Sequence, residues 1–224
     1  EGSRAALPIV LGYLPVGLAY GALAGGAGFT WLETVLMSIL VFAGSAQFVT
    51  VAMWAGGADL FSIIATTFFV NLRHLLMSAA LAPYFRGVSS AWLAWFGAEL
   101  TDESFAIHSA RLRQNPIGYQ RPTMLVTNAV AHLGWIIASG LGHLLQSGIA
   151  DPGRFGLDFA LPAMFIALLL IQFTCKLDVV VAVVAFLVSI FLGQLIPGYW
   201  GAISAAISAA LIGAVLVRRK GVAQ

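Results

Sequence analysis

The chain has 224 residues, of which 9% are charged and 60% are hydrophobic. A soluble globular domain has about 25% charged and about 45–50% apolar residues, so this composition excludes that class. Intrinsic disorder is excluded as well, because disordered segments are poor in apolar residues and rich in charge. A single cysteine excludes an internal disulfide framework and a multi-cysteine metal site. The composition therefore predicts an all-α, polytopic integral membrane protein.

Eight apolar segments are long enough for transmembrane helices, since the bilayer core of about 30 Å needs about 20 residues per helix. They leave only short loops, so we expect a single transmembrane transporter domain over residues 1–224. A seven-span alternative stays open, because two spans could merge around Lys176 and because Pro8 and Pro15 interrupt the first span. The eight predicted spans are Ala5–Gly28, Thr34–Gly56, Leu60–Ala82, Ala91–Ala110, Thr123–Gln146, Asp158–Cys175, Asp178–Ile196 and Tyr199–Val217.

Lysine and arginine predict the orientation, because they concentrate in cytoplasmic loops. With eight crossings and the N-terminus inside, only Arg86 and Arg154 lie on the outer side. Both termini are then expected in the cytoplasm. The basic residues predicted on the cytoplasmic side are Arg4, Arg111, Arg113, Arg121, Lys176, Arg218, Arg219 and Lys220.

Small and polar residues in the first two spans predict close packing and a change of helix geometry. A GxxxGxxxG pattern from Gly17 to Gly25 favours close helix packing, either inside the protein or against a second subunit. In the second span, Gly44, Ser45 and Gln47 are poor helix formers at membrane depth. Two alternatives are open there: a discontinuous helix whose free N–H groups bind a substrate carboxylate, or a kinked but continuous helix. For the first span we expect the proline kink.

The third span carries a polar stripe. Thr67, Asn71, His74 and Ser78 are spaced so that they share one face of a helix, and Arg73 lies beside that face. Insertion scales assign about 2.5–3.5 kcal/mol to one arginine or aspartate at the centre of a membrane helix. Such residues are therefore expected to face protein or water and to mark a functional site.

The fourth span carries three acids on one helical face, Glu99, Asp102 and Glu103. If the third and fourth spans form an antiparallel hairpin, His74 lies opposite Glu99 and Asn71 lies opposite Asp102. Three acids then stand against one permanent positive charge, so that a surplus carboxylate could take up and release protons. In the fifth span, Asn128 and His132 share a face and either line the same cavity or only pack.

These residues predict a site that binds the charged ends of a zwitterion and couples its movement to protons. The alternative is a set of buried ion pairs that only fixes the helix packing. We predict that the amino group meets the acids, and that the carboxylate meets Arg73 or the backbone around Gly44–Gln47. The predicted substrate-binding residues are Arg73, Glu99, Asp102, Glu103, Gly44, Ser45, Gln47 and Asn71, and the predicted proton-coupling residues are His74, Glu99, Asp102 and Glu103.

Enzyme signatures are absent from the sequence. It contains no HExxH zinc motif, no GxxxxGK[ST] nucleotide loop and no GxSxG nucleophile turn. No Cys/His spacing indicates a metal site. We therefore expect no catalytic residues, no metal or other cofactor and no nucleic-acid partner, and the expected environment is the lipid bilayer.

Four motifs resemble the AzlC family in residues, order and spacing: GYLPVG at 12–17, FAGSAQF at 42–48, NLRH at 71–74 and LTDE at 100–103. The resemblance is densest from residue 8 to about residue 110. It implies a permease of the bacterial inner membrane that exports branched-chain amino acids such as valine, leucine and isoleucine. It also implies a much smaller membrane partner of the AzlD type.

Together these observations predict a secondary transporter that exports hydrophobic L-amino acids, methionine among them, and that is coupled to the proton gradient. Two other functions stay open. A channel or facilitator for small polar solutes would show no accumulation against a gradient. A non-transporting membrane scaffold would tolerate replacement of the acids by amides.

Overall fold

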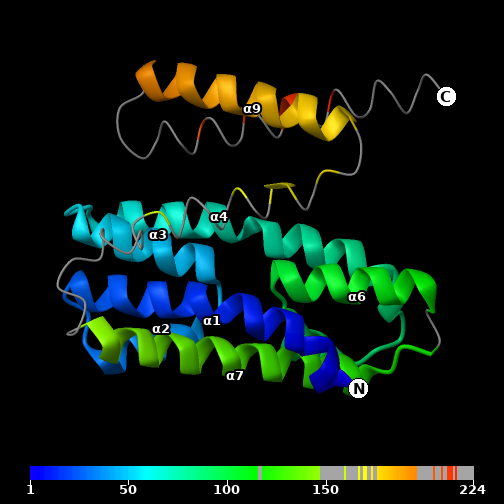
Figure 1. Ribbon diagram of the computed structural model, residues 1–224. Helices are drawn as coiled ribbons and strands as arrows, with labels where there is room; N and C mark the ends of the chain where they lie inside the picture. The colour runs from blue at the N-terminus through cyan, green and yellow to red at the C-terminus, as the bar shows by residue number, and fades with distance from the viewer. Residues whose placement is uncertain are drawn as a thin grey trace. The chain divides into compact units, whose positions relative to one another are not determined.

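The computed structural model describes residues 1–115, 118–146 and 176–195, together with positions 159, 166, 169, 170, 173, 204, 208, 211–213 and 215. Within these residues the chain is helical and has no β-strand (Figure 1). The chain divides into two compact units, Glu1–Leu161 and Pro162–Gln224. The predicted spans Asp158–Cys175 and Tyr199–Val217 fall largely outside the described residues, as does the expected turn before Lys176.

Four helices in the described part of the chain are long and apolar enough to cross a membrane. In the first unit these are α1 (Gly2–Gly26), α7 (Arg121–Leu145) and α4 (Leu60–Leu81), which the 3-10 turn η1 (Ala82–Phe85) extends. In the second unit it is α9 (Lys176–Leu195). The helices predicted at these positions are confirmed, and α1 runs without a break through both of its prolines.

Small residues bring α1 and α7 together side by side. A Cβ atom on Gly21 would collide with the backbone of Ser139, and one on Gly142 would collide with the carbonyl of Leu18. The hydroxyl of Thr127 donates to the carbonyl of Gly2 at 3.2 Å, so the two helices begin at the same end and run in parallel. The glycine pattern of α1 therefore serves packing inside this unit, where helices in lipid gain dispersion energy by close approach.

The predicted second span does not cross as one helix. It forms α2 (Trp31–Leu40) and α3 (Gly44–Ala55), and the chain turns back at Val41–Ala43. The rings of Phe29 and Trp54, at the open end, lie 5.8 Å apart. A straight helix would separate these residues by about 37 Å at 1.5 Å per residue. The predicted discontinuity is therefore present, but it makes a re-entrant hairpin rather than a crossing.

The predicted fourth span is also a hairpin. Its two arms are α5 (Ser90–Ala98) and α6 (Asp102–Gln114), joined by the turn Glu99–Thr101. The rings of Phe96 and His108 lie 5.2 Å apart, whereas a straight helix would place these residues about 18 Å apart. The prediction of a continuous helix over Ala91–Ala110 is wrong, because Thr101 caps a new helix at the point where three acids follow the apolar arm.

The two hairpins enter the unit from opposite ends. The α2/α3 hairpin opens where α1 and α7 finish, since the indole of Trp31 donates to the carbonyl of Gly140 at 3.2 Å. The α5/α6 hairpin opens where α1 and α7 begin, because Leu112 packs in one cluster with Phe85 and Met124. Figure 1 shows α3 beside one half of α4 and α6 beside the other half.

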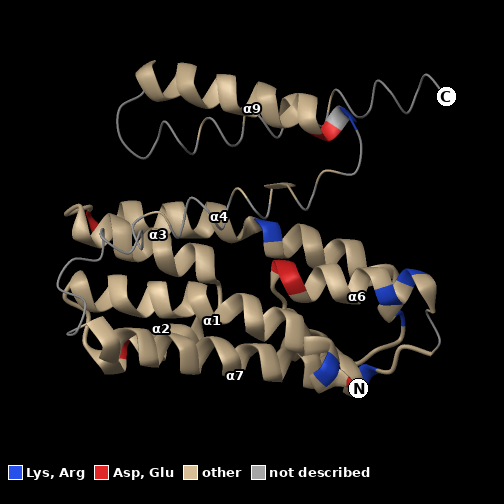
Figure 2. Ribbon diagram, viewed as in Figure 1, with Lys and Arg blue, Asp and Glu red and all other residues tan. Residues whose placement is uncertain are grey.

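This arrangement changes the predicted distribution of charge. Because α5/α6 does not cross, Arg86 lies at the same end as the N-terminus, where Arg111 pairs with Glu1 at 3.8 Å. The expectation that Arg86 lies on the opposite side is therefore wrong. Apart from Arg73, the basic residues described in this unit gather at that end, while Glu33 and Asp59 mark the other end (Figure 2).

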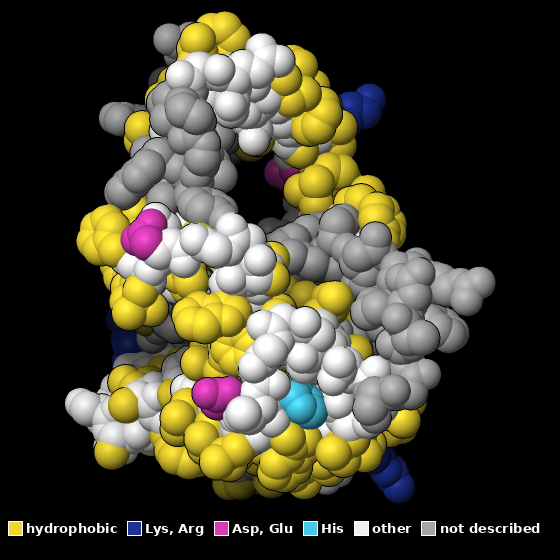
Figure 3. Space-filling view, turned by 90° about the vertical axis from the view of Figure 1, so that its left-hand side faces the viewer, with side chains coloured by type: hydrophobic (Ala, Val, Ile, Leu, Met, Phe, Trp, Pro, Cys, Tyr) yellow, Lys and Arg dark blue, Asp and Glu magenta, His cyan; other side chains and the backbone are white. Residues whose placement is uncertain are grey.

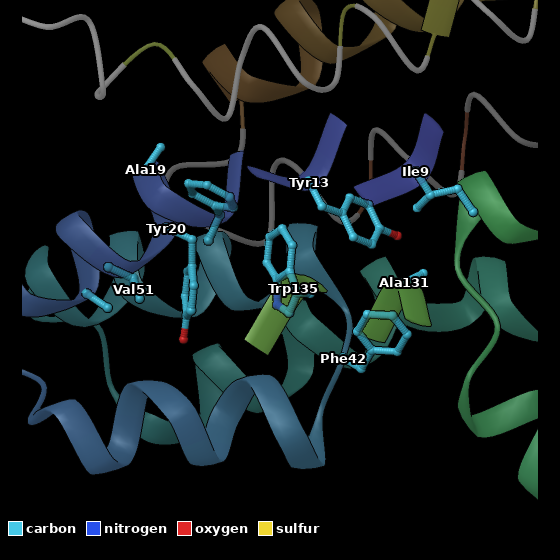
Figure 4. Close-up of a cluster of buried hydrophobic side chains, with 10 residues drawn as sticks. Ile9, Tyr13, Ala19, Tyr20, Phe42, Val51, Ala131 and Trp135 are labelled. Carbon is cyan, nitrogen blue, oxygen red and sulfur yellow. The ribbon is translucent and has the colours of Figure 1, made fainter. Parts of the chain in front are cut away.

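Aromatic rings fill the core between α1, α3 and α7. Trp135 lies between Tyr13 and Tyr20, with ring centroids 5.3 Å and 5.9 Å away (Figure 4). Phe42, from the turn of the first hairpin, packs against Tyr13 at 6.3 Å. Outside this core, hydrophobic side chains make up much of the visible surface (Figure 3), as expected for helices that face lipid.

Candidate functional site

The turns of the two hairpins are held by polar side chains from the middle of the three long helices. Tyr13 lies halfway along α1, Arg73 lies in the middle of α4, and His132 lies halfway along α7. Each of them contacts residues at one or both hairpin tips, by which we mean the turns Val41–Ala43 and Glu99–Thr101 and the helical turn on either side of each. The candidate site therefore lies at mid-membrane depth, where ionisable groups are retained for function.

Arg73 joins the two hairpins. Its Nη2 atom donates to the hydroxyl of Ser45, in the first turn of α3, and its Nη1 atom lies 2.5 Å from the carboxylate of Asp102, in the first turn of α6. The side chains of Arg73 and Asp102 are 26% and 20% exposed, so water or a ligand can reach the pair. The Nε atom of Arg73 is buried and has no hydrogen-bond partner among the residues that the structure describes.

The beginning of α3 adds to this positive site. Within the described part of the chain no side chain caps α3, so the first N–H groups of the helix have no side-chain acceptor there. Free N–H groups and the helix dipole favour an anion at this position. The predicted carboxylate-binding elements, Arg73 and the backbone that follows Ala43, thus lie together.

His132 also joins the two hairpins. Its Nδ1 atom lies 3.0 Å and 3.1 Å from the two carboxylate oxygens of Glu99, at the end of α5. Its Nε2 atom lies 3.0 Å from the carbonyl oxygen of Ser38, near the end of α2. The ring of Phe42 stacks on the imidazole with centroids 4.0 Å apart. The predicted partner of Glu99 was His74; the structure instead bonds Glu99 to His132, because the chain turns toward α7 after Ala98.

Phe42 adopts a left-handed backbone conformation with φ of 40°. This region costs about 1–2 kcal/mol for a residue with a side chain. The buried ring, 5% exposed, compensates by stacking on His132 and packing on Tyr13. Strain of this kind in a buried turn is typical of functional sites.

The third contact comes from α1. The hydroxyl of Tyr13 donates to the carboxylate of Glu103 at 2.7 Å and lies 2.8 Å from the hydroxyl of Thr101. Thr101 in turn caps α6, accepting from the amide of Ser104 at 3.3 Å. The first hydrogen bonds of α6 and the position of Glu103 thus depend on α1.

The other residues predicted for the site each have different neighbours. Gln47 is fully buried, with its amide group between the hydroxyl of Ser38 and the indole of Trp135 at 3.2 Å and 3.0 Å. Gly44 faces the ring of Trp135. The side-chain oxygen of Asn71 is buried and has no partner among the described residues, and the Nδ1 atom of His74 lies 3.1 Å from the Asn71 carbonyl in its own helix.

The predicted register placed Asn71 opposite Asp102; the ion pair of Asp102 is with Arg73, two residues further along α4. Sequence reasoning also gave no site role to Tyr13 or Thr101, and it left His132 between a cavity and a packing role. One signal could have found them: each lies midway along an apolar segment, and Tyr13 and Thr101 belong to the motifs at 12–17 and 100–103.

The arrangement offers both signs of charge within one site. Arg73 and the start of α3 can bind an anion, whereas Glu99, Asp102 and Glu103 can bind a cation or a proton. Among the residues described, no group of three or more His, Cys, Asp or Glu side chains could hold a metal ion. This chemistry suits a zwitterion and a proton.

An apolar cavity of about 210 Å³ lies close to this site. It is bounded by α4 and η1 on one side and by α5 on the other. Two of its lining residues link it to the site: Ser78 lies one turn after His74, and Gly97 lies two residues before Glu99. The other lining residues are hydrophobic: Leu81, Ala82, Phe85, Leu93 and Phe96.

Fold and site together define a multi-pass membrane protein with a charged centre at mid-membrane depth. The family model of the AzlC protein matches residues 8–149, which include α4, α7, both hairpins and α1 from Pro8 onward. The chain belongs to the AzlC family. The family assignment made from the four motifs is therefore confirmed.

Curated relatives agree with this assignment. The inner membrane protein YgaZ of Escherichia coli is 33% identical over 180 residues, which cover 79% of this chain and 74% of the relative. The branched-chain amino acid transport protein AzlC of Bacillus subtilis is 31% identical over 74% of this chain and 64% of its own length. An uncharacterized membrane protein of Archaeoglobus fulgidus is 33% identical over 76% of this chain and 74% of its own length. No solved structure matches the chain.

Proposed function

We propose that this chain is the large subunit of a secondary transporter that exports branched-chain and other hydrophobic L-amino acids across the inner membrane of a bacterium. The proposed substrates are valine, leucine, isoleucine and methionine. Transport is coupled to protons and needs a small membrane subunit of the AzlD type. Membership of the AzlC family and the name of the Bacillus subtilis relative support this function.

The proposal rests on one observation: Arg73 contacts the start of α3, and in the described part of the chain neither that helix start nor the buried Nε atom of Arg73 has a side-chain partner. A substrate carboxylate placed there would accept from a guanidinium N–H and from free backbone N–H groups, which are charge-assisted hydrogen bonds. It would compete with Asp102 for the guanidinium. Binding of substrate would thereby loosen the contact between α4 and α6.

The amino group of the substrate would bind among the acids of the α5/α6 tip. Glu99, Asp102 and Glu103 supply the negative charge, and the unpaired side-chain oxygen of Asn71 supplies a further acceptor. The apolar cavity beside Ser78 and Gly97 would take the branched side chain. One methylene changes binding in an apolar pocket by about 1–3 kcal/mol, so we expect modest selectivity among the proposed substrates.

The proposed orientation follows from the distribution of charge. Arg4, Arg86, Arg111, Arg113 and Arg121 lie at or next to the end of the first unit that carries the N-terminus, and Glu33 and Asp59 lie at the other end. By the positive-inside rule, the basic end faces the cytoplasm. The α5/α6 hairpin then opens to the cytoplasm and the α2/α3 hairpin opens to the outside. We also propose a cytoplasmic C-terminus.

The proposal is tested by reconstitution with the small subunit in vesicles loaded with labelled valine. Efflux should be faster with an inward proton gradient, and valine should accumulate against its own gradient. Arg73→Gln should abolish transport, while the matched Arg86→Gln variant should retain it. Equilibration without accumulation, in the presence or absence of the proton gradient, would instead identify a channel or facilitator. Transport at the wild-type rate by Glu99→Gln and Asp102→Asn variants would favour a scaffold role for these acids.

A further inference from the structure

The contacts of His132 bear on where a proton is held in the mid-membrane site. The carbonyl of Ser38 can only accept a hydrogen bond, so the Nε2 atom at 3.0 Å must carry a hydrogen. The Nδ1 atom faces both carboxylate oxygens of Glu99 at 3.0 Å and 3.1 Å. A contact there needs one more proton, either on the imidazole or on the carboxyl group. Glu99 and His132 therefore share one proton between them.

Loss of that proton would break the contact. With Nε2 still donating to Ser38, the lone pair of Nδ1 would face an ionised carboxylate, and two acceptors repel each other. The imidazole would keep its bond to α2, whereas Glu99 would be free to turn away. The shared proton thus fastens the α5/α6 tip to α7, while the attachment of the α2/α3 hairpin does not depend on it.

The surrounding ionisable groups single out Glu99 among the three acids. On α6, Asp102 is paired with Arg73 of α4, and Glu103 accepts from Tyr13 of α1. On α4, the Nδ1 atom of His74 faces the carbonyl of Asn71. The arms α2 and α3 bring no charge to the tip, since Glu33 lies in the first turn of α2 and α3 has no ionisable residue. Glu99 is the acid whose partner is a histidine, the side chain that ordinarily gains or loses its proton near neutral pH.

We propose, on the basis of the transport function above, that Glu99 holds either the proton shared with His132 or the ammonium group of the substrate, but not both. Its carboxylate is one site for two cations. A substrate ammonium that reaches Glu99 from the cytoplasm displaces the proton, and a proton arriving from outside displaces the ammonium. This competition makes export an exchange of one amino acid for one proton, and it gives His132 the role of positioning Glu99 and its proton.

The direct test measures proton release when valine binds to the purified complex with its small subunit, in weakly buffered solution. Wild-type protein should release about one proton per valine bound, because one carboxylate serves both cations. Glu99→Gln should release none, since the amide donates to His132 without a labile proton. The matched variant His143→Gln, on the same helix and bonded to Thr34, should release as much as wild type. Undiminished release from Glu99→Gln, or uptake of protons by wild type, would overturn the proposal.

A second measurement does not depend on substrate. A cysteine placed at the exposed Ala98, in a Cys175→Ser background, reports whether the α5/α6 tip is fastened. The rate at which this cysteine reacts with a water-soluble maleimide should rise as the pH is raised. A cysteine at Ala55, labelled in the same way, corrects this rate for the pH dependence of the thiol itself. The rise should disappear in Glu99→Gln, which keeps the tip fastened. If wild-type protein does not bind valine but still shows this pH response, the transport function is rejected and the proton site is retained. If the corrected labelling rate of wild-type protein does not change with pH, the proton site is rejected.

Discussion

The α2/α3 hairpin brings no ionisable side chain to its tip, whereas the α5/α6 hairpin carries Glu99, Asp102 and Glu103 there. The arms are similar in length, with 10 and 12 residues in the first hairpin and 9 and 13 in the second. Their shapes are thus alike and their chemistry is opposite. The same pair of long-helix residues, Arg73 and His132, contacts both tips.

The attachments of the two hairpins differ as well. Besides its contact with the Arg73 guanidinium at Ser45, the first hairpin is fixed to α7 by neutral hydrogen bonds, from Trp31 at the open end to Gln47 near the tip. The tip of the second hairpin is held by contacts that involve charge, through Arg73, His132 and Tyr13. Only contacts of the second kind respond to a proton or to a charged substrate. We therefore expect the first hairpin to act as a fixed base and the second to move during transport.

The largest expected effect is at Arg73, which serves both hairpins. Arg73→Ala leaves Asp102 without its partner. Breaking a buried pair costs about 3–5 kcal/mol, and because water reaches this pair we expect a loss at the lower end of that range. The double variant Arg73→Ala/Asp102→Ala should recover part of this loss without recovering transport. Thermal unfolding of the two variants in detergent, compared with wild type, measures the difference. Equal stability of the single and double variants would mean that the pair does not hold the second hairpin.

The second prediction compares two tyrosines of α1. Tyr13→Phe removes the hydrogen bond to the carboxylate of Glu103, which is worth about 1.5–3 kcal/mol for a charged acceptor. Tyr20→Phe removes contacts with neutral partners only, a weak one to the sulfur of Met37 at 3.7 Å and a hydrogen bond with the side chain of Gln47. The loss of stability should thus be clearly larger at Tyr13, as measured by thermal unfolding of both variants. A larger loss at Tyr20 would show that the first hairpin depends more on α1 than the second does.

The third prediction concerns the interior of the first hairpin. Gln47→Leu leaves the indole N–H of Trp135 and the hydroxyl of Ser38 without their partner in a buried site. Leaving a buried polar group unsatisfied costs about 1–3 kcal/mol. Stability should fall by a similar amount at pH 6 and pH 8, because no titrating group takes part. A loss that changes strongly between these two pH values would connect the first hairpin to the proton site.

The smallest effect is expected at the loop that follows the first hairpin. Asp59 caps α4, accepting from the amide of Ser62 at 3.0 Å and from its hydroxyl at 2.6 Å. These hydrogen bonds lower the pKa of the Asp59 carboxyl, the side-chain bond more than the backbone one. The stabilisation is therefore present at neutral pH and is lost as the pH falls through the lowered pKa.

Unfolding of Asp59→Ala and Asp59→Asn across this pH range tests the cap. The alanine variant should be slightly less stable than wild type at neutral pH, and the difference should shrink in acid. Asparagine keeps an acceptor at the cap position and should lose less. A difference for Asp59→Ala that stays constant down to acidic pH would show that the charge of the cap contributes nothing.

Much of this protein could be predicted from its sequence. Composition and apolar length suffice for α1, α4 and α7, because a bilayer imposes a minimum length on any helix that crosses it. The rarity of charge made Arg73, Glu99, Asp102 and Glu103 recognisable, since each is expensive at membrane depth. The four motifs identified the family, whose model includes both hairpins. These properties are local, or they depend only on the solvent that surrounds the chain.

Only the tertiary structure decided whether an apolar segment crosses or turns back. Residues 34–56 and 91–110 satisfy the length rule for a span, yet each folds into two short arms. Polar side chains of the long helices hold the tips of these arms. Which side chains the acids contact depends on whether the segment crosses or turns back. Glu99 meets His132 rather than His74, and Arg86 moves to the N-terminal end. Such contacts join residues far apart in the chain, and the local pattern around each of them does not specify the other.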